Sequence, residues 1–435
     1  MIDDPLPPGL DDALAFPLIE ALTGRRSRRF ALGAEIPDGV FAFRSDKPPL
    51  PLSELEKMLV LTACAGNTGW HYAIMRNARY APHLSNYACA AGGRTFPSGA
   101  GFHMSELFFT DDEGVYLLQT RDAPELVAPG PDGRRDLGEL LAAHRGRVRK
   151  LSDGRLKLPP EVPHVEGHNT WIVNCPGSLL AIPVADAAQY NLANICYYVQ
   201  NGVGFFDDTL NAPIPGLARF SRLVDLDNAL PITFMEQYTL AECTVEIATS
   251  CYAGALMLQA MGLGGWMFNG LNPFSVLGAS GDPEVPGLGF DFFNDPRWPL
   301  PQVTGLPGVF EASCPPNHPD MKSAVDALCE RKFGPGGPFH PGTPGAWKDS
   351  PRVRGAADIH DEEFRECVTL IADYILSRFG RFPGTIPAVY VQTYLQAQHL
   401  DLDFYDTFFK PGAYLQSHAR HFSRWHGPDK GEGGG

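Results

Sequence analysis

Apolar residues recur with helical spacing in two amphipathic segments of the chain. In residues 51–66 (PLSELEKMLVLTACAG) they fall on one face, and Ser53 is followed three positions later by Glu56, the pattern of a capping box. Residues 361–380 (DEEFRECVTLIADYILSRFG) show the same period and end in glycine. Both segments are therefore predicted to be helices.

A third helical segment is apolar on nearly every side. Residues 239–265 (TLAECTVEIATSCYAGALMLQAMGLGG) carry small and medium-sized apolar residues all round, and Gly264 and Gly265 supply a stop signal. A helix of this kind is buried, so it lies either in a core or across a subunit interface.

Strand patterns separate these helices. Residues 106–119 read as two short strands joined by an acidic glycine turn, and residues 178–186 read as a buried strand. Further helices are expected over 13–24, 385–409 and 411–426. The mixture predicts an α+β fold.

Proline and glycine content indicates how the rest of the chain is organised. The 40 prolines and 46 glycines indicate many turns and long connections, with insertions expected at about 122–168 and 281–335. The expected organisation is a disordered N-terminus (1–12), a main domain (13–335), a helical C-terminal extension (336–426) and a flexible tail (427–435).

The net charge of the chain argues against some kinds of binding partner. A formal net charge of −15 argues against nucleic acid or an anionic membrane surface. The nine cysteines show no CxxC spacing, and no run of eighteen apolar residues occurs. We therefore expect a cytoplasmic protein that binds a small-molecule or peptide substrate.

Basic residues cluster once, in GRRSRRF (24–30). Arg25, Ser27 and Arg29 alternate, so an extended segment would project two guanidiniums and a hydroxyl to one side, as phosphate binding requires. A solvated basic patch explains the same letters.

Glycines concentrate in GGRTFPSGAGFHMSEL (92–107). Such a segment either makes a tight turn between two elements or leaves room for a planar ligand, and both interpretations stay open. His103 follows this turn and is a candidate for lining the mouth of an active site. His418 and His421 have a spacing compatible with a metal, but no acidic or cysteine ligand lies close in sequence, so no metal site is predicted.

The order of three segments resembles the nitroreductase superfamily of FMN-dependent enzymes, and within it the SagB-type dehydrogenase branch. The segments are RRSRR (25–29), RTFPSGAGFHMSELFF (94–109) and EIATSCYAGALMLQAMGLGG (246–265). The resemblance covers about residues 15–120 and 170–280. It implies a central antiparallel sheet flanked by helices, with residues 13–335 forming the FMN domain.

The same resemblance implies roles for individual residues. Arg25, Ser27 and Arg29 would bind the phosphate and ribityl chain of FMN, and Ser98 would contact flavin N5. The residues implied to lie along the flavin are Arg94, Pro97, Ser98, Gly99, Gly101, Gly264 and Gly265.

The implied activity is hydride or two-electron transfer through flavin N5, with NAD(P)H or an organic substrate as donor. Dehydrogenation of a peptide-like or small-molecule substrate by a homodimer, with flavin at the subunit interface, is the leading interpretation. The alternative is a flavin-free protein of the same fold that serves in binding or storage.

Overall fold

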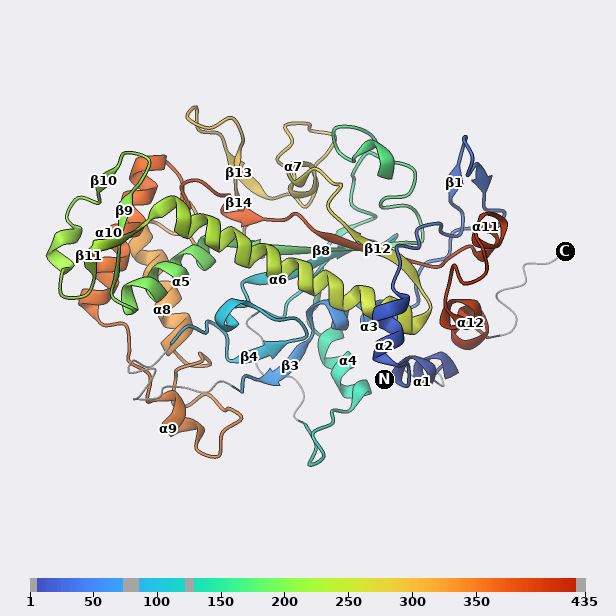
Figure 1. The fold of residues 1–435 in the computed structure, drawn as a ribbon, viewed down its shortest axis with the longest axis horizontal. Helices are drawn as coiled ribbons and strands as arrows, with labels where there is room; N and C mark the ends of the chain where they lie inside the picture. Colours follow the sequence, from blue (N-terminus) through green and yellow to red (C-terminus); the bar gives the residue numbers. More distant parts are fainter. Residues whose placement is uncertain (1–5, 73–85, 122–128, 428–435) are drawn as a thin grey trace.

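A computed structural model describes residues 6–72, 86–121 and 129–427 (Figure 1). Its centre is a seven-stranded antiparallel sheet with strand order β12–β17–β8–β5–β6–β7, and β16 pairs with β8. The strands are β5 (Ser105–Thr110), β6 (Gly114–Leu118), β7 (Val148–Asp153), β8 (Leu179–Asp186), β12 (Gly264–Phe268), β16 (Val389–Tyr390) and β17 (Tyr394–Gln398).

Four smaller sheets surround this centre. They are formed by β1 (Glu35–Ile36) with β2 (Phe43–Arg44), by β3 (Asn67–Trp70) with β4 (Gly92–Arg94), by β9 (Val203–Asp207) with β10 (Ala212–Pro213) and β11 (Asp225–Pro231), and by β13 (Asp291–Phe293) with β14 (Gln302–Leu306) and β15 (Phe310–Glu311).

One helix, α6 (Ile232–Met261), runs along most of the molecule across the sheet (Figure 1). The other α-helices are α1 (Pro8–Leu14), α2 (Leu18–Gly24), α3 (Glu54–Ala65), α4 (Leu137–Arg145), α5 (Ala187–Gln200), α7 (Pro273–Leu277), α8 (Met321–Phe333), α9 (Ser350–Arg354), α10 (Glu362–Phe379), α11 (Leu402–Phe408) and α12 (Gln416–Trp425). Within the described parts of the chain, no helix combines the length and the apolarity that crossing a bilayer requires.

Both faces of the central sheet are covered. Alternate residues of β5 point to opposite faces: Leu107 and Phe109 belong to the apolar cluster formed with α3 and α6, whereas Phe108 packs against Phe290 and Phe310 at ring-centroid distances of 5.5 and 6.0 Å. Strands buried on both faces appear in the sequence as continuous apolar runs, and this pattern allowed β8 to be predicted.

The local signals for the main helices are confirmed. In α3, Ser53 Oγ accepts from the backbone N–H of Glu56, and the Glu56 carboxylate accepts from the Ser53 N–H at 2.7 Å. Helix α10 ends at Gly380 in the left-handed conformation. Helix α6 ends at Gly262, so the prediction that Gly264 and Gly265 stop it is wrong.

The C-terminal part of the chain differs from its prediction. Residues 385–409 were expected to be helical, but they contain β16 and β17, and β17 lies between β12 and β8. Residues 336–426 therefore complete the central sheet and are not a separate helical extension. Strand β17 does alternate apolar residues with Gln396 and Gln398, but the alternation is short, and its glutamines are buried as well.

Two other boundaries change. Within 1–12, which was expected to be disordered, residues from Pro8 onward form α1, and this helix contacts α6 and α12. Within the expected insertion 122–168, β7 pairs with β6 and extends the central sheet. Residues 1–5, 122–128 and 428–435 lie outside the described part of the chain.

Candidate functional site

In the basic segment that follows α2, some side chains are exposed at the surface and others are buried. Arg25 and Ser27 are exposed, and the Arg25 guanidinium lies 6.0 Å from the centroid of the Tyr252 ring on α6. Arg29 instead lies 5.7 Å from the rings of both Trp171 and Trp266. Of the three residues predicted to project to one open side, Arg25 and Ser27 are exposed, whereas Arg29 is half-buried against two tryptophans.

Arg28, which the sequence analysis did not single out, is the buried arginine of this segment. Its guanidinium donates to Ala413 O at 2.9 Å, to Gln259 Oε1 at 2.8 Å and to Gly24 O at 3.2 Å. Its carbonyl accepts from the Gly265 N–H at 2.8 Å. The RRSRR segment is thereby fixed to the end of α6 and to β12.

The glycine-rich turn lies against the N-terminal half of α6. Ser98 Oγ donates to Glu246 Oε2 at 2.5 Å and accepts from the His103 N–H at 2.9 Å. Glu246 Oε1 accepts from the N–H and the hydroxyl of Ser105 at 2.8 and 2.6 Å. A single buried carboxylate thus holds both the turn and the first residue of β5.

The close approach of α6 explains one glycine of the turn. A Cβ at Gly99 would lie 2.6 Å from Glu242 Oε1 and 2.9 Å from the Tyr190 hydroxyl. The first interpretation of the glycine-rich segment, a tight turn against a neighbouring element, therefore accounts for Gly99. Pro97 O lies 3.5 Å from Thr249 Oγ1, at the edge of the exposed face of α6.

Glu242 is a titratable group that the sequence analysis missed. Burial, together with the neighbouring charge of Glu246, raises the pKa of Glu242 to about 7, although Asn194 donates to its carboxylate at 2.7 Å. A carboxyl group that titrates near neutrality can hold or release a proton in catalysis. Its only signal in the sequence is the pair of glutamates one helical turn apart.

Three further predicted residues are enclosed by the protein, whereas Gly101 is half-buried and adopts a φ of +72° in the turn. Gly264 and Gly265 are buried, and Gly265 adopts a φ of +147° with Gln396 O only 2.1 Å from a Cβ at that position. Arg94 is buried, and its guanidinium donates to Ser105 O at 3.2 Å. These three residues support the backbone around the turn and β12.

His103 is also buried, with 3% of its surface exposed. Its ring lies 5.5 Å from those of His71 and Phe96, and burial together with Arg94, His71 and Arg331 holds its pKa well below the ordinary value. His103 therefore packs beneath the turn as a neutral side chain, and the expectation that it lines an open mouth is not met.

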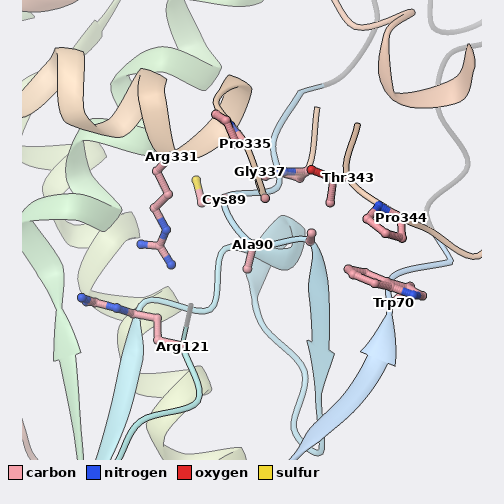
Figure 2. Close-up of a pocket in the computed structure, with 12 residues that line it drawn as sticks. Trp70, Cys89, Ala90, Arg121, Arg331, Pro335, Gly337, Thr343 and Pro344 are labelled. Carbon is pink, nitrogen blue, oxygen red and sulfur yellow. The ribbon is translucent and has the colours of Figure 1, made fainter. Parts of the chain in front are cut away.

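A cavity of about 420 Å³ lies beside β3 and the residues that precede β4 (Figure 2). Trp70, Ala90 and several prolines of the loop 335–344 form apolar walls, while Arg121 and Arg331 project into one end. Arg331 of α8 also contacts Met104 Sδ at 3.6 Å, next to His103. An apolar cavity with a cationic end suits a small organic anion.

An acidic group at the surface is partly paired with a lysine. Asp46, Asp401 and Asp403 lie close enough to share a cation, but Lys47 Nζ contacts Asp401 at 3.2 Å and Asp403 at 2.7 Å. The lysine ammonium therefore offsets part of the negative charge of this group.

The amino-acid sequence matches no protein-family model and no curated protein. Among solved structures, the chain is similar to a crystal structure described as "a putative nitroreductase" from Ralstonia eutropha JMP134, at 16% identity and a TM-score of 0.25. That alignment covers 59% of this chain and 71% of the other.

Proposed function

We propose that the chain is an FMN-dependent oxidoreductase that works as a homodimer, with the flavin along the exposed face of α6. The observation that carries the proposal is the place of two sequence segments on this helix. Arg25 lies over Tyr252, and Pro97 lies beside Thr249. Three residues of an α-helix rise by about 5 Å, so the basic segment and the glycine-rich turn border neighbouring parts of one face.

The residues on this face suit a mononucleotide in part. Arg25 and Ser27 are exposed and offer charged and hydroxyl donors to a phosphate. The Ser98 hydroxyl reaches flavin N5 only if it exchanges its bond to Glu246, so its predicted contact with N5 requires a rearrangement on binding. When bound, FMN supplies two-electron chemistry through N5.

The chain's own contribution to the reaction is proton control and positioning. Glu242 has a pKa of about 7 and lies next to Gly99, so it can hold a proton beside the turn at neutral pH. Glu246 keeps the turn in place through Ser98 and Ser105. Glu242 is thus the proposed proton donor or acceptor, and Glu246 is a positioning residue.

The exposed face of α6 also supports the homodimer. Phe234, Tyr238, Val245 and Tyr252 recur with helical spacing and are 51%, 44%, 53% and 37% exposed. A continuous apolar stripe on a soluble surface marks an interaction site. An antiparallel pair of α6 helices would cover this stripe.

The cavity lined by Arg121 and Arg331 is proposed as a binding site for an organic anion that lies apart from the flavin face, since none of its lining residues belongs to α6 or to the basic segment. Its apolar walls and cationic end suit a peptide-like or small-molecule ligand that carries a carboxylate, and the loop 335–344 restricts entry. NAD(P)H or an organic substrate would reduce the flavin. Anaerobic bleaching of bound flavin by NADH, by NADPH or by candidate substrates distinguishes these donors.

One observation favours a flavin-free binding protein as the second candidate. Arg29, which was expected at the phosphate, lies between Trp171 and Trp266 and donates to Asn169 Oδ1 at 3.0 Å. Arg29 is half-buried, and its guanidinium is already bonded to Asn169. A phosphate site on this face would therefore depend on Arg25 and Ser27.

The test is FMN titration of the purified full-length protein and of two matched variants. Arg25→Ala removes the proposed phosphate ligand, whereas Arg26→Ala removes the same charge from an exposed neighbour whose guanidinium bonds to Thr23 O and Arg25 O. Charge-assisted hydrogen bonds contribute about 1.5–3 kcal/mol, so Arg25→Ala should weaken FMN binding by about 10-fold or more. Equal affinities of the two variants would refute the site, and a wild-type protein that ignores FMN would support the flavin-free candidate.

A further inference from the structure

Three distant parts of the sequence bring four metal-binding side chains together away from the proposed flavin face. Glu56 lies in the first turn of α3, His399 directly follows β17, and His421 and His426 lie in α12 and immediately after it. Helices α3 and α12 lie at the same end of the molecule (Figure 1). The side chains of Glu56, His399 and His421 are 0%, 1% and 2% exposed, and that of His426 is 10% exposed.

The distances from the Glu56 carboxylate to the three histidine nitrogens match those between ligands of one metal ion. Glu56 Oε1 lies 3.4 Å from His399 Nε2, 3.1 Å from His421 Nε2 and 3.2 Å from His426 Nε2. All four atoms lie within 4.8 Å of one another. Nitrogen and oxygen ligands about 2.0–2.1 Å from a tetrahedral zinc ion are about 3.3–3.4 Å apart, close to the distances found here.

The outer nitrogens of two histidines determine where their protons lie. His399 Nδ1 lies 2.9 Å from Leu50 O, and His421 Nδ1 lies 2.8 Å from Met261 O. A carbonyl oxygen only accepts, so both Nδ1 atoms carry the hydrogen. In each neutral ring the Nε2 lone pair then faces the Glu56 carboxylate, the orientation that metal-ligating histidines take when their second nitrogen bonds to a carbonyl.

The carboxylate is oriented in the same way. Glu56 Oε2 accepts from the N–H and the hydroxyl of Ser53, both at 2.7 Å, which completes the capping box. Its second oxygen, Oε1, is therefore directed at the three Nε2 atoms. Helix capping explains Oε2 but not the convergence of three imidazoles on Oε1.

Without a cation, this arrangement is electrostatically unfavourable. With both rings neutral, two lone pairs face a negative oxygen, and with one ring protonated, the lone pair of the other still does. With both rings doubly protonated, two positive charges lie on rings whose centroids are 5.1 Å apart. Two buried imidazolium rings at that distance repel one another. One divalent cation at the centre removes both difficulties because it accepts every lone pair.

We propose that Glu56, His399, His421 and His426 form a binding site for one divalent transition-metal ion, of which zinc fits best. Three imidazoles and one carboxylate suit a tetrahedral zinc ion, and four protein ligands in a largely buried position make the site structural. The ion would join α3, the end of β17 and α12, and so fix the C-terminal helix to the domain. The site is independent of the proposed flavin chemistry.

His418 provides the matched control. It lies in α12 one turn before His421 and is equally buried, but its Nδ1 accepts from the Leu415 N–H and the residue is outside the cluster. The pair His418 and His421, considered from spacing alone, therefore does not form a site together. The acidic ligand that the sequence seemed to lack is Glu56.

The test uses the full-length protein and measures metal, not activity. After removal of metal with a chelator, the protein is titrated with ZnCl₂ by calorimetry and with CoCl₂ by visible absorption. We expect one equivalent of metal per chain, Co²⁺ bands of tetrahedral intensity, and a rise in Tm on adding Zn²⁺. His418→Gln should retain the equivalent.

Two variants should lose it. Glu56→Gln keeps an oxygen for the capping box but removes the anionic ligand, and His426→Gln changes the least buried ligand, so at least one of them should fold. A wild-type protein that binds neither Zn²⁺ nor Co²⁺ at micromolar concentration would overturn the proposal. Stoichiometric binding that survives in folded Glu56→Gln and His426→Gln would overturn it equally.

Discussion

Replacing Glu246 with alanine removes the acceptor that the glycine-rich turn and the start of β5 share. Three donors lose their partner, namely the hydroxyl of Ser98 and the N–H and hydroxyl of Ser105. Bonds to a charged group contribute about 1.5–3 kcal/mol each, but removing the carboxylate also recovers the cost of burying its charge. The expected net loss in the free energy of unfolding is about 3–5 kcal/mol, because the Ser105 N–H remains buried without an acceptor.

The matched control is Glu242→Ala, one turn earlier on the same helix. It removes the same side chain, but its carboxyl group is only partly buried and accepts from Asn194. Urea unfolding followed by circular dichroism should show a loss of about 1 kcal/mol for this variant, against the larger loss for Glu246→Ala. Equal losses, or no loss at Glu246, would refute the account of how the turn is held.

Three further perturbations have defined outcomes. Gly99→Ala should cost about 1–3 kcal/mol through collision with Glu242 and Tyr190, whereas Gly167→Ala, where no atom lies within 4 Å of the new Cβ, should leave Tm nearly unchanged. Arg28→Lys should lower Tm by several degrees because one ammonium cannot reach Ala413 O, Gln259 and Gly24 O together. Arg26→Lys, at the surface, should leave Tm unchanged, and equal shifts in the two variants would contradict the role of Arg28. Because the pKa of Glu242 rises from its ordinary 4.5 to about 7 in the folded state, the wild type should lose stability relative to Glu242→Gln as pH rises from 4.5 through 7, and thermal melts that stay parallel across this range would disprove that shift.

Most of the fold could be predicted from patterns of residues that lie close together in the sequence. The capping box at Ser53, the acidic turn between β5 and β6, and the apolar run of β8 each depend on residues close in sequence, and each prediction is confirmed. Strand β17 was missed because its apolar–polar alternation spans only a few residues within a segment that was expected to be helical. Only the partner strands reveal that its residues are extended, and those partners lie far away in the chain.

The candidate sites were less accessible to sequence reasoning because their contacts are long-range. Glu246 is 148 positions from Ser98, and Glu56 is 343 positions from His399. The motifs identified the glycine-rich turn and the basic segment, but not the helix face on which they lie. Only the structure shows that Arg25 of the basic segment is exposed and that Arg28 is buried and supports the core.

The central claim, a homodimer that holds flavin along α6, is tested most directly by native mass spectrometry of the full-length protein after incubation with FMN. The account predicts a dimer carrying two FMN molecules. It also predicts that replacing the exposed Tyr252 with aspartate disrupts both the dimer and the flavin complex, since the substitution places a charge in the apolar stripe. A protein that remains monomeric and free of FMN under these conditions would contradict the account.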